Sequence, residues 1–144
     1  MSRRVLHLLP VLVLVVLPAG CGESSPTTGS TTSRSWELVE ILDATAAGGS
    51  VSSRPVPVGT AEQQRALTRD LTRPELARRL AEVVAEHETA PGRRLVGAIV
   101  AIGCTPPTEV TYDDGLVRPP PSGAQVQCLA PVTSLAVLEV PAEG

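Results

Sequence analysis

The sequence predicts an α+β domain with a mostly antiparallel sheet, one or two helices packed on one face of the sheet, and one disulfide. The order of the elements favours this class, because an extended segment is followed by two helical segments and then by several extended ones. The run Leu95–Ile102 is continuous, apolar and rich in β-branched residues, as expected of a strand buried on both faces. Two cysteines, Cys104 and Cys128, follow this run and supply the predicted disulfide.

The first part of the domain is predicted to be extended. Residues 36–42 mix apolar and acidic side chains and predict a strand, whereas residues 44–53 are small and glycine-rich and predict a loop. Between residues 51 and 58, valines alternate with polar residues and prolines. Because Pro55 and Pro57 lack the N–H that a sheet ladder uses, this segment predicts an edge strand or an extended segment.

Two capping boxes predict two helices. Thr60 and Gln63 have the spacing of an N-cap and its reciprocal partner, and a helix is expected from there to about Leu71. Residues 72–75 repeat the pattern with a proline in the first turn, where its missing N–H does no harm. The helix that follows is expected to end at residues 91–92, Pro-Gly. It carries an apolar stripe at helical spacing, formed by Leu76, Leu80, Val83 and Val84.

After the central run, the chain predicts short strands joined by turns. Residues 109–112 and 116–118 predict a hairpin around the turn Asp-Asp-Gly at residues 113–115. Residues 124–128 alternate between apolar and polar side chains, which predicts a half-buried strand that carries its cysteine inward. Residues 135–140 predict the last strand. The disulfide is therefore expected to tie two strands of the sheet across a proline-rich loop.

The N-terminus has the pattern of a secretory signal peptide over residues 1–20. Two arginines precede a thirteen-residue apolar run and a Pro-Ala-Gly sequence that ends at Cys21. A membrane span needs about 20 apolar residues, so a transmembrane helix is a weaker alternative, as is a signal peptide without an anchor. Residues 21–35 are mostly Ser, Thr and Gly and predict a flexible tether, and residues 36–144 predict one small exported domain.

Ala19, Gly20 and Cys21 resemble the lipobox of bacterial lipoproteins, with Pro18 standing where an aliphatic residue is preferred. The resemblance implies that the signal is cut before Cys21, that the Cys21 sulfur receives a diacylglyceryl group, and that the new amino group is open to acylation. Two or more acyl chains hold a protein stably on a membrane. The expected location is the extracytoplasmic face of the cell membrane.

With Cys21 lipidated, Cys104 and Cys128 are the two cysteines that remain. An exported chain lies in an oxidising compartment, which favours a disulfide between them. Two alternatives are a pair of free or redox-active thiols, and a metal site that would add His87. The C-x-x-C spacing typical of redox and metal sites is absent from the sequence.

The composition excludes one class of partner. Loss of the signal leaves ten arginines against fifteen acidic residues, a net charge of about −5, with no basic cluster. Nucleic acid is therefore not expected as a partner, and an anionic lipid surface would not attract the domain electrostatically. Lys, Asn and Phe are absent, which indicates a GC-rich genome such as that of an actinobacterium.

The sequence offers little chemistry for catalysis. His87 is the only histidine after the signal, and it lies between Glu86 and Glu88 at the expected end of a helix. This position predicts a solvated cap residue that complements the helix dipole. Asp113 and Asp114 predict a turn rather than an acid–base pair, and no phosphate loop, EF-hand or dinucleotide fingerprint is present. Neither a cofactor nor a bound metal is expected.

The sequence thus predicts a membrane-anchored lipoprotein whose domain binds an envelope protein or a small ligand and is not an enzyme. Its layout, with the strand Val-Gly-Ala-Ile-Val-Ala-Ile-Gly and the closing Leu-Glu-Val-Pro, is similar to small exported domains of the protease-complex-stabilising type. That resemblance implies a non-enzymatic accessory role. The alternative functions are a small envelope enzyme and a purely structural envelope component.

Overall fold

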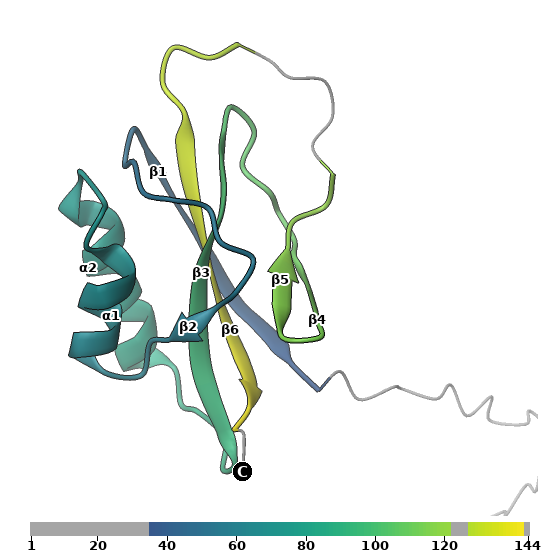
Figure 1. Ribbon diagram of the computed structural model, residues 1–144. Helices are drawn as coiled ribbons and strands as arrows, with labels where there is room; N and C mark the ends of the chain where they lie inside the picture. Colours follow the sequence, from purple (N-terminus) through teal and green to yellow (C-terminus); the bar gives the residue numbers. More distant parts are fainter. Residues whose placement is uncertain (1–34, 122–126, 143–144) are drawn as a thin grey trace, which may run out of the picture. The chain divides into compact units, whose positions relative to one another are not determined.

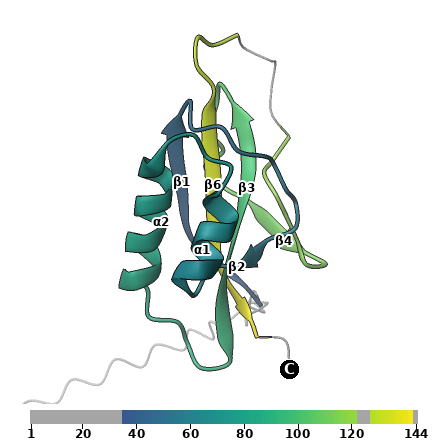
Figure 2. The ribbon, with the colours of Figure 1, turned by 60° about the vertical axis from the view of Figure 1, so that its left-hand side comes forward.

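A computed structural model describes residues 35–121 and 127–142. Its main sheet has four antiparallel strands in the order β1-β6-β3-β2, and a separate hairpin pairs β4 with β5. Both helices cover one face of the sheet, and the hairpin lies on the other face (Figures 1 and 2). The predicted α+β class with one disulfide is confirmed. The elements are β1 (Glu37–Thr45), β2 (Val56–Pro57), α1 (Ala61–Thr68), α2 (Pro74–Glu86), β3 (Arg93–Gly103), β4 (Thr111–Asp113), β5 (Leu116–Arg118) and β6 (Val132–Pro141).

β3 and β6 form the centre of the sheet. They are the longest strands of the described chain and pair along almost their whole length, from Arg93 opposite Pro141 to Gly103 opposite Val132. Residues 95–100 of β3 and residues 133–140 of β6 are buried. This agrees with the continuous apolar run in β3, because a strand covered on both faces needs no alternating polar positions.

The sheet separates two apolar cores. The helix-side core contains the stripe of α2, with Leu76 and Leu80 fully buried. The hairpin-side core packs Val117 of β5 and the half-buried Tyr112 of β4 against the opposite face. Tyr112 also makes an edge-to-face contact with Trp36, with ring centroids 6.2 Å apart. The two aromatic residues of the chain therefore pack together at the start of β1.

The first capping box is confirmed, and the second is wrong. The Thr60 hydroxyl accepts from the Gln63 backbone N–H, and the Gln63 side chain accepts from the Thr60 N–H. At α2 the N-cap is Arg73, which makes no capping hydrogen bond through its side chain, although the helix does begin with a proline at its first position. The Thr72 hydroxyl instead donates to the Ala46 carbonyl, so a tertiary contact replaces the local cap.

Residues 52–58 connect the main sheet to the hairpin. The Ser52 N–H donates to the Ile99 carbonyl of β3, and the Val117 N–H of β5 donates to the Ser53 carbonyl. β2 is an edge strand, as its prolines predict. In the hairpin turn, Asp114 and Gly115 both have positive φ, +50° and +73°, which is the geometry of a type I′ turn and confirms the predicted hairpin.

Several predicted boundaries are wrong, among them the end of the first helix, which lies at Thr68 rather than near Leu71. β1 continues to Thr45, into the segment expected to be a loop, and α2 ends at Glu86 rather than at residues 91–92. Most of the strand expected over residues 124–128 lies outside the described residues. Its last two residues are described and are not in a strand, and the Cys128 residue is exposed rather than turned inward. Within residues 35–121 and 127–142, neither helix is long and apolar enough to cross a membrane.

Candidate functional site

A buried charge cluster joins β6, β3 and the end of α2. Its centre is Glu139, which occupies an otherwise apolar stretch of β6 and lies opposite Leu95 of β3 in the sheet register. Its side chain is only 5% exposed. Burying a carboxylate is costly unless charged partners and hydrogen bonds compensate for the lost water. Two side chains, the guanidinium of Arg93 and the imidazole of His87, provide the compensation.

Both partners reach the same carboxylate from opposite ends of the connection between α2 and β3. His87 Nε2 lies 2.6 Å from Oε2 of Glu139, and Arg93 Nε lies 2.5 Å from Oε1. Arg93 Nη2 also donates to the Glu139 backbone carbonyl at 2.8 Å. The two side chains are 22% and 25% exposed. The cluster thus fixes the C-terminal end of α2 and the start of β3 to the central strand.

The balance of forces keeps Glu139 ionised. The hydrogen bond from His87 is the largest influence on the pKa of this carboxyl and lowers it, whereas burial acts in the opposite direction. The charge of Arg93 and its hydrogen bond lower the pKa further. The net result is a pKa below the ordinary value for glutamate, so the cluster contains a carboxylate at neutral pH.

His87 is the C-cap of α2, as predicted, but the prediction that its side chain is solvated is wrong. Its side chain turns into the protein and contacts a carboxylate 52 residues away in the sequence, rather than remaining in solvent between Glu86 and Glu88. Sequence reasoning assigned no role to Glu139 or Arg93. One signal was available for Glu139, because it is the only charged residue in the run 132–140. A charge in a strand that is buried on both faces requires a partner.

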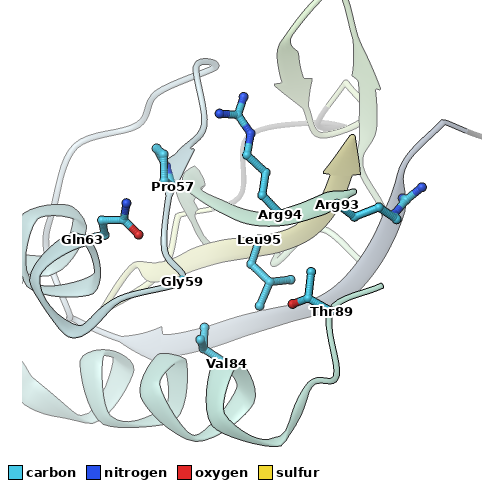
Figure 3. Close-up of a pocket in the computed structure, with 8 residues that line it drawn as sticks. All are labelled: Pro57, Gly59, Gln63, Val84, Thr89, Arg93, Arg94 and Leu95. Carbon is cyan, nitrogen blue, oxygen red and sulfur yellow. The ribbon is translucent and has the colours of Figure 1, made fainter. Parts of the chain in front are cut away.

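A cavity of about 430 Å³ lies beside this cluster, on the helix side of the sheet. Figure 3 shows the side chains of Val84, Thr89 and Leu95 gathered on one side of the cavity, while the guanidinium of Arg93 points away from it. The lining combines apolar side chains with hydroxyl and amide groups, a mixture that can hold a small ligand with both apolar and polar parts. The lining residues are Pro57, Gly59, Gln63, Val84, Thr89, Arg93, Arg94 and Leu95.

The other candidate residues lie elsewhere. Cys104 and Cys128 form the disulfide, with their Cα atoms 5.5 Å apart. Cys104 follows the end of β3, whereas His87 lies near its start, so the structure does not bring His87 to the cysteines. The bond ties the end of β3 to the segment before β6, rather than joining two strands. Asp113 and Asp114 lie at the hairpin turn, as predicted, and Cys21 lies outside the described residues.

Comparisons with protein-family models, with curated proteins and with solved structures find no match to this chain. Within the part of the chain that the structure describes, no three His, Cys, Asp or Glu side chains are grouped so that they could hold a metal ion. The functional argument therefore rests on the residues themselves.

Proposed function

We propose that this chain is a lipid-anchored, non-enzymatic binding or accessory domain on the extracytoplasmic face of a bacterial cell membrane. The observation that carries the proposal is the pairing of its cysteines. The chain has three cysteines, and Cys104 and Cys128 are bonded to each other. A disulfide is expected in an exported protein. The third cysteine is Cys21, at the position where the lipobox-like sequence would place the lipid.

The tether limits where a partner can be. About fifteen residues separate the proposed lipid from the first strand, and a fully extended chain of that length spans at most about 50 Å. A flexible Ser/Thr/Gly-rich tether of this length has a typical end-to-end distance of roughly 20 Å. Such a tether keeps the domain close to the membrane and raises its effective concentration for partners on the same surface.

The charge cluster favours binding over catalysis. The imidazole of His87 is held by Glu139, which in turn is held by Arg93. This arrangement resembles the orienting part of a catalytic triad, but the carboxylate that holds the imidazole is itself paired with the guanidinium of Arg93. The cluster therefore supports the end of α2, and the adjacent cavity offers a surface for a small ligand.

Replacing Cys21 by Ser tests the anchor. The C21S chain should appear in the soluble fraction or remain as an uncut precursor, because the sulfur that would receive the diacylglyceryl group is gone. Intact-mass analysis of the membrane fraction should show the acyl mass on the wild-type chain cut before Cys21. The C104S chain is the matched control and should stay membrane-bound with the same acyl mass. A wild-type mature chain without acyl mass would refute the anchor.

A hydrolase screen tests the non-enzymatic part of the proposal. The full chain in detergent should hydrolyse ester, amide, phosphate and glycoside probes no faster than buffer does. The H87Q chain should give the same background rates, because His87 has a positioning role. Turnover by the wild-type chain that H87Q abolishes would make an envelope enzyme the better interpretation.

A further inference from the structure

The Cys104–Cys128 disulfide lies at the surface of the domain, because Cys128 is exposed and Cys104 is half-buried. The bond joins the segment after β3 to the segment before β6, at the opposite end of the sheet from the start of β1 (Figure 1). The chain before residue 36 enters the domain at the start of β1, so the bond is remote from the point where the proposed tether is attached. Exposed disulfides exchange with thiols more readily than disulfides enclosed in a core.

The surroundings of the bond are apolar and uncharged. Leu129 directly follows Cys128 and is the most exposed of the large apolar residues in the described chain. Residues 95–108 and 119–138 contain no Asp, Glu, Arg or Lys, although the domain is acidic overall. A carboxylate near the bond would repel an attacking thiolate, so the uncharged segments favour exchange. A partner that carries its reactive thiol in an apolar, uncharged surface would fit this end of the domain.

The two sulfur atoms differ in access. A thiolate that approaches from solvent meets the exposed Cys128 before the half-buried Cys104. In thiol–disulfide exchange, the sulfur that is attacked forms the mixed disulfide and the other sulfur leaves as a thiolate. The geometry therefore makes Cys128 the attacked residue and Cys104 the leaving group.

The bond holds one layer of the domain. The loop that it closes carries the β4–β5 hairpin, whose Val117 packs in the hairpin-side core. The residues of the helix-side core and the paired residues of β3 and β6 all lie outside that loop. Breaking the bond therefore loosens the hairpin layer, while the pairing of the main sheet and its helices remains.

We propose that the Cys104–Cys128 disulfide is a redox switch reduced by a dithiol protein of the C-x-x-C class, which docks on Leu129. A thiolate of the partner attacks Sγ of Cys128, the bond to Cys104 breaks, and Cys104 leaves as a thiolate that takes up a proton. The partner's second thiolate then attacks the partner's own sulfur in the mixed disulfide and releases Cys128, which also takes up a proton. Two electrons thus pass to the cysteine pair, and the partner dithiol becomes a disulfide. The proposal concerns the bond alone and depends neither on a lipid at Cys21 nor on a ligand in the cavity.

A thioredoxin is the probe, used with the full chain in detergent. The thioredoxin variant whose second active-site cysteine is replaced by serine stops at the mixed disulfide, and peptide mapping should find it bonded to Cys128. Intact thioredoxin should reduce the bond, and L129S should slow this reduction about tenfold, the effect expected when one leucine is no longer buried at a contact. The matched control is V56S, which changes an exposed valine in β2, away from the bond, and should leave the rate unchanged. Dithiothreitol is too small to use the docking surface and should reduce the wild type and L129S equally fast.

Hydrogen exchange of the reduced and alkylated chain tests the switch. Exchange should accelerate more in β4 and β5 than in β3 and β6, whereas equal acceleration throughout would show that the bond only adds global stability. The absence of an adduct would show that the bond is closed to exchange, and an adduct on Cys104 would contradict the assigned attack. Equal rates for L129S and the wild type with thioredoxin would remove Leu129 from the docking surface. Slower reduction of L129S by dithiothreitol would mean that Leu129 acts on the bond and not on the partner.

Discussion

Removing the Cys104–Cys128 disulfide is expected to lower the free energy of unfolding by about 3 kcal/mol, because the bond closes a loop of about 25 residues in the unfolded chain. The same loop carries the β4–β5 hairpin, whose Val117 and Tyr112 complete the hairpin-side core. Without the disulfide, the β4–β5 hairpin is held to the sheet by packing and by backbone hydrogen bonds such as that from the Val117 N–H to the Ser53 carbonyl. The melting temperature should fall by more than about 10 °C for a domain of this size.

Urea unfolding of the C104S, C128S and doubly substituted chains measures this effect. All three should lose the same stability, because each lacks the same bond, and a reductant should destabilise the wild type only. Hydrogen exchange should accelerate first in β4 and β5. A loss below about 1 kcal/mol would mean that the hairpin is held by its packing alone, since that is far less than loop-closure entropy predicts.

The elements that were predicted correctly are those that a short stretch of consecutive residues is enough to identify. The run at residues 95–102 identifies a doubly buried strand without knowledge of its partners. The Thr60–Gln63 box is complete within four residues. The turn at Asp114 and Gly115 needs only two residues that tolerate positive φ. In each case the pattern that identifies the element lies within the segment, so the local sequence is sufficient.

The errors all involve contacts between distant residues. The second capping box failed because Thr72 bonds to Ala46, 26 residues away. α2 stops before the expected proline because His87 leaves the helix and bonds to Glu139. A local pattern that ends in Glu-His-Glu gives no information about a carboxylate on the last strand. The same long-range contacts make up the charge cluster, which is why the sequence did not predict it.

Replacing Glu139 should strongly destabilise the described domain. E139A leaves the charge of Arg93 without its counter-ion and the imidazole of His87 without its partner, and breaking a buried pair in this way costs about 3–5 kcal/mol. E139Q retains hydrogen-bonding atoms but not the charge, so its loss should be smaller, about 1–3 kcal/mol. The control is E82Q on the surface of α2, where the pair with Arg78 is more than half exposed and should contribute less than about 1 kcal/mol.

The pH dependence of stability tests whether the negative charge of Glu139 is what stabilises the fold. The folded-state pKa of Glu139 is lowered, chiefly by the hydrogen bond from His87, so folding favours the ionised form. This contribution is complete above the unfolded pKa of about 4.3 and is lost as the pH falls from there through the lower folded-state pKa. The stability difference between the wild type and E139Q should therefore be largest near neutral pH and should shrink below about pH 4. Urea unfolding at a series of pH values measures that difference. A difference that stays constant down to pH 2.5 would show that E139Q acts through packing, and that the carboxylate charge does not hold α2 to the sheet.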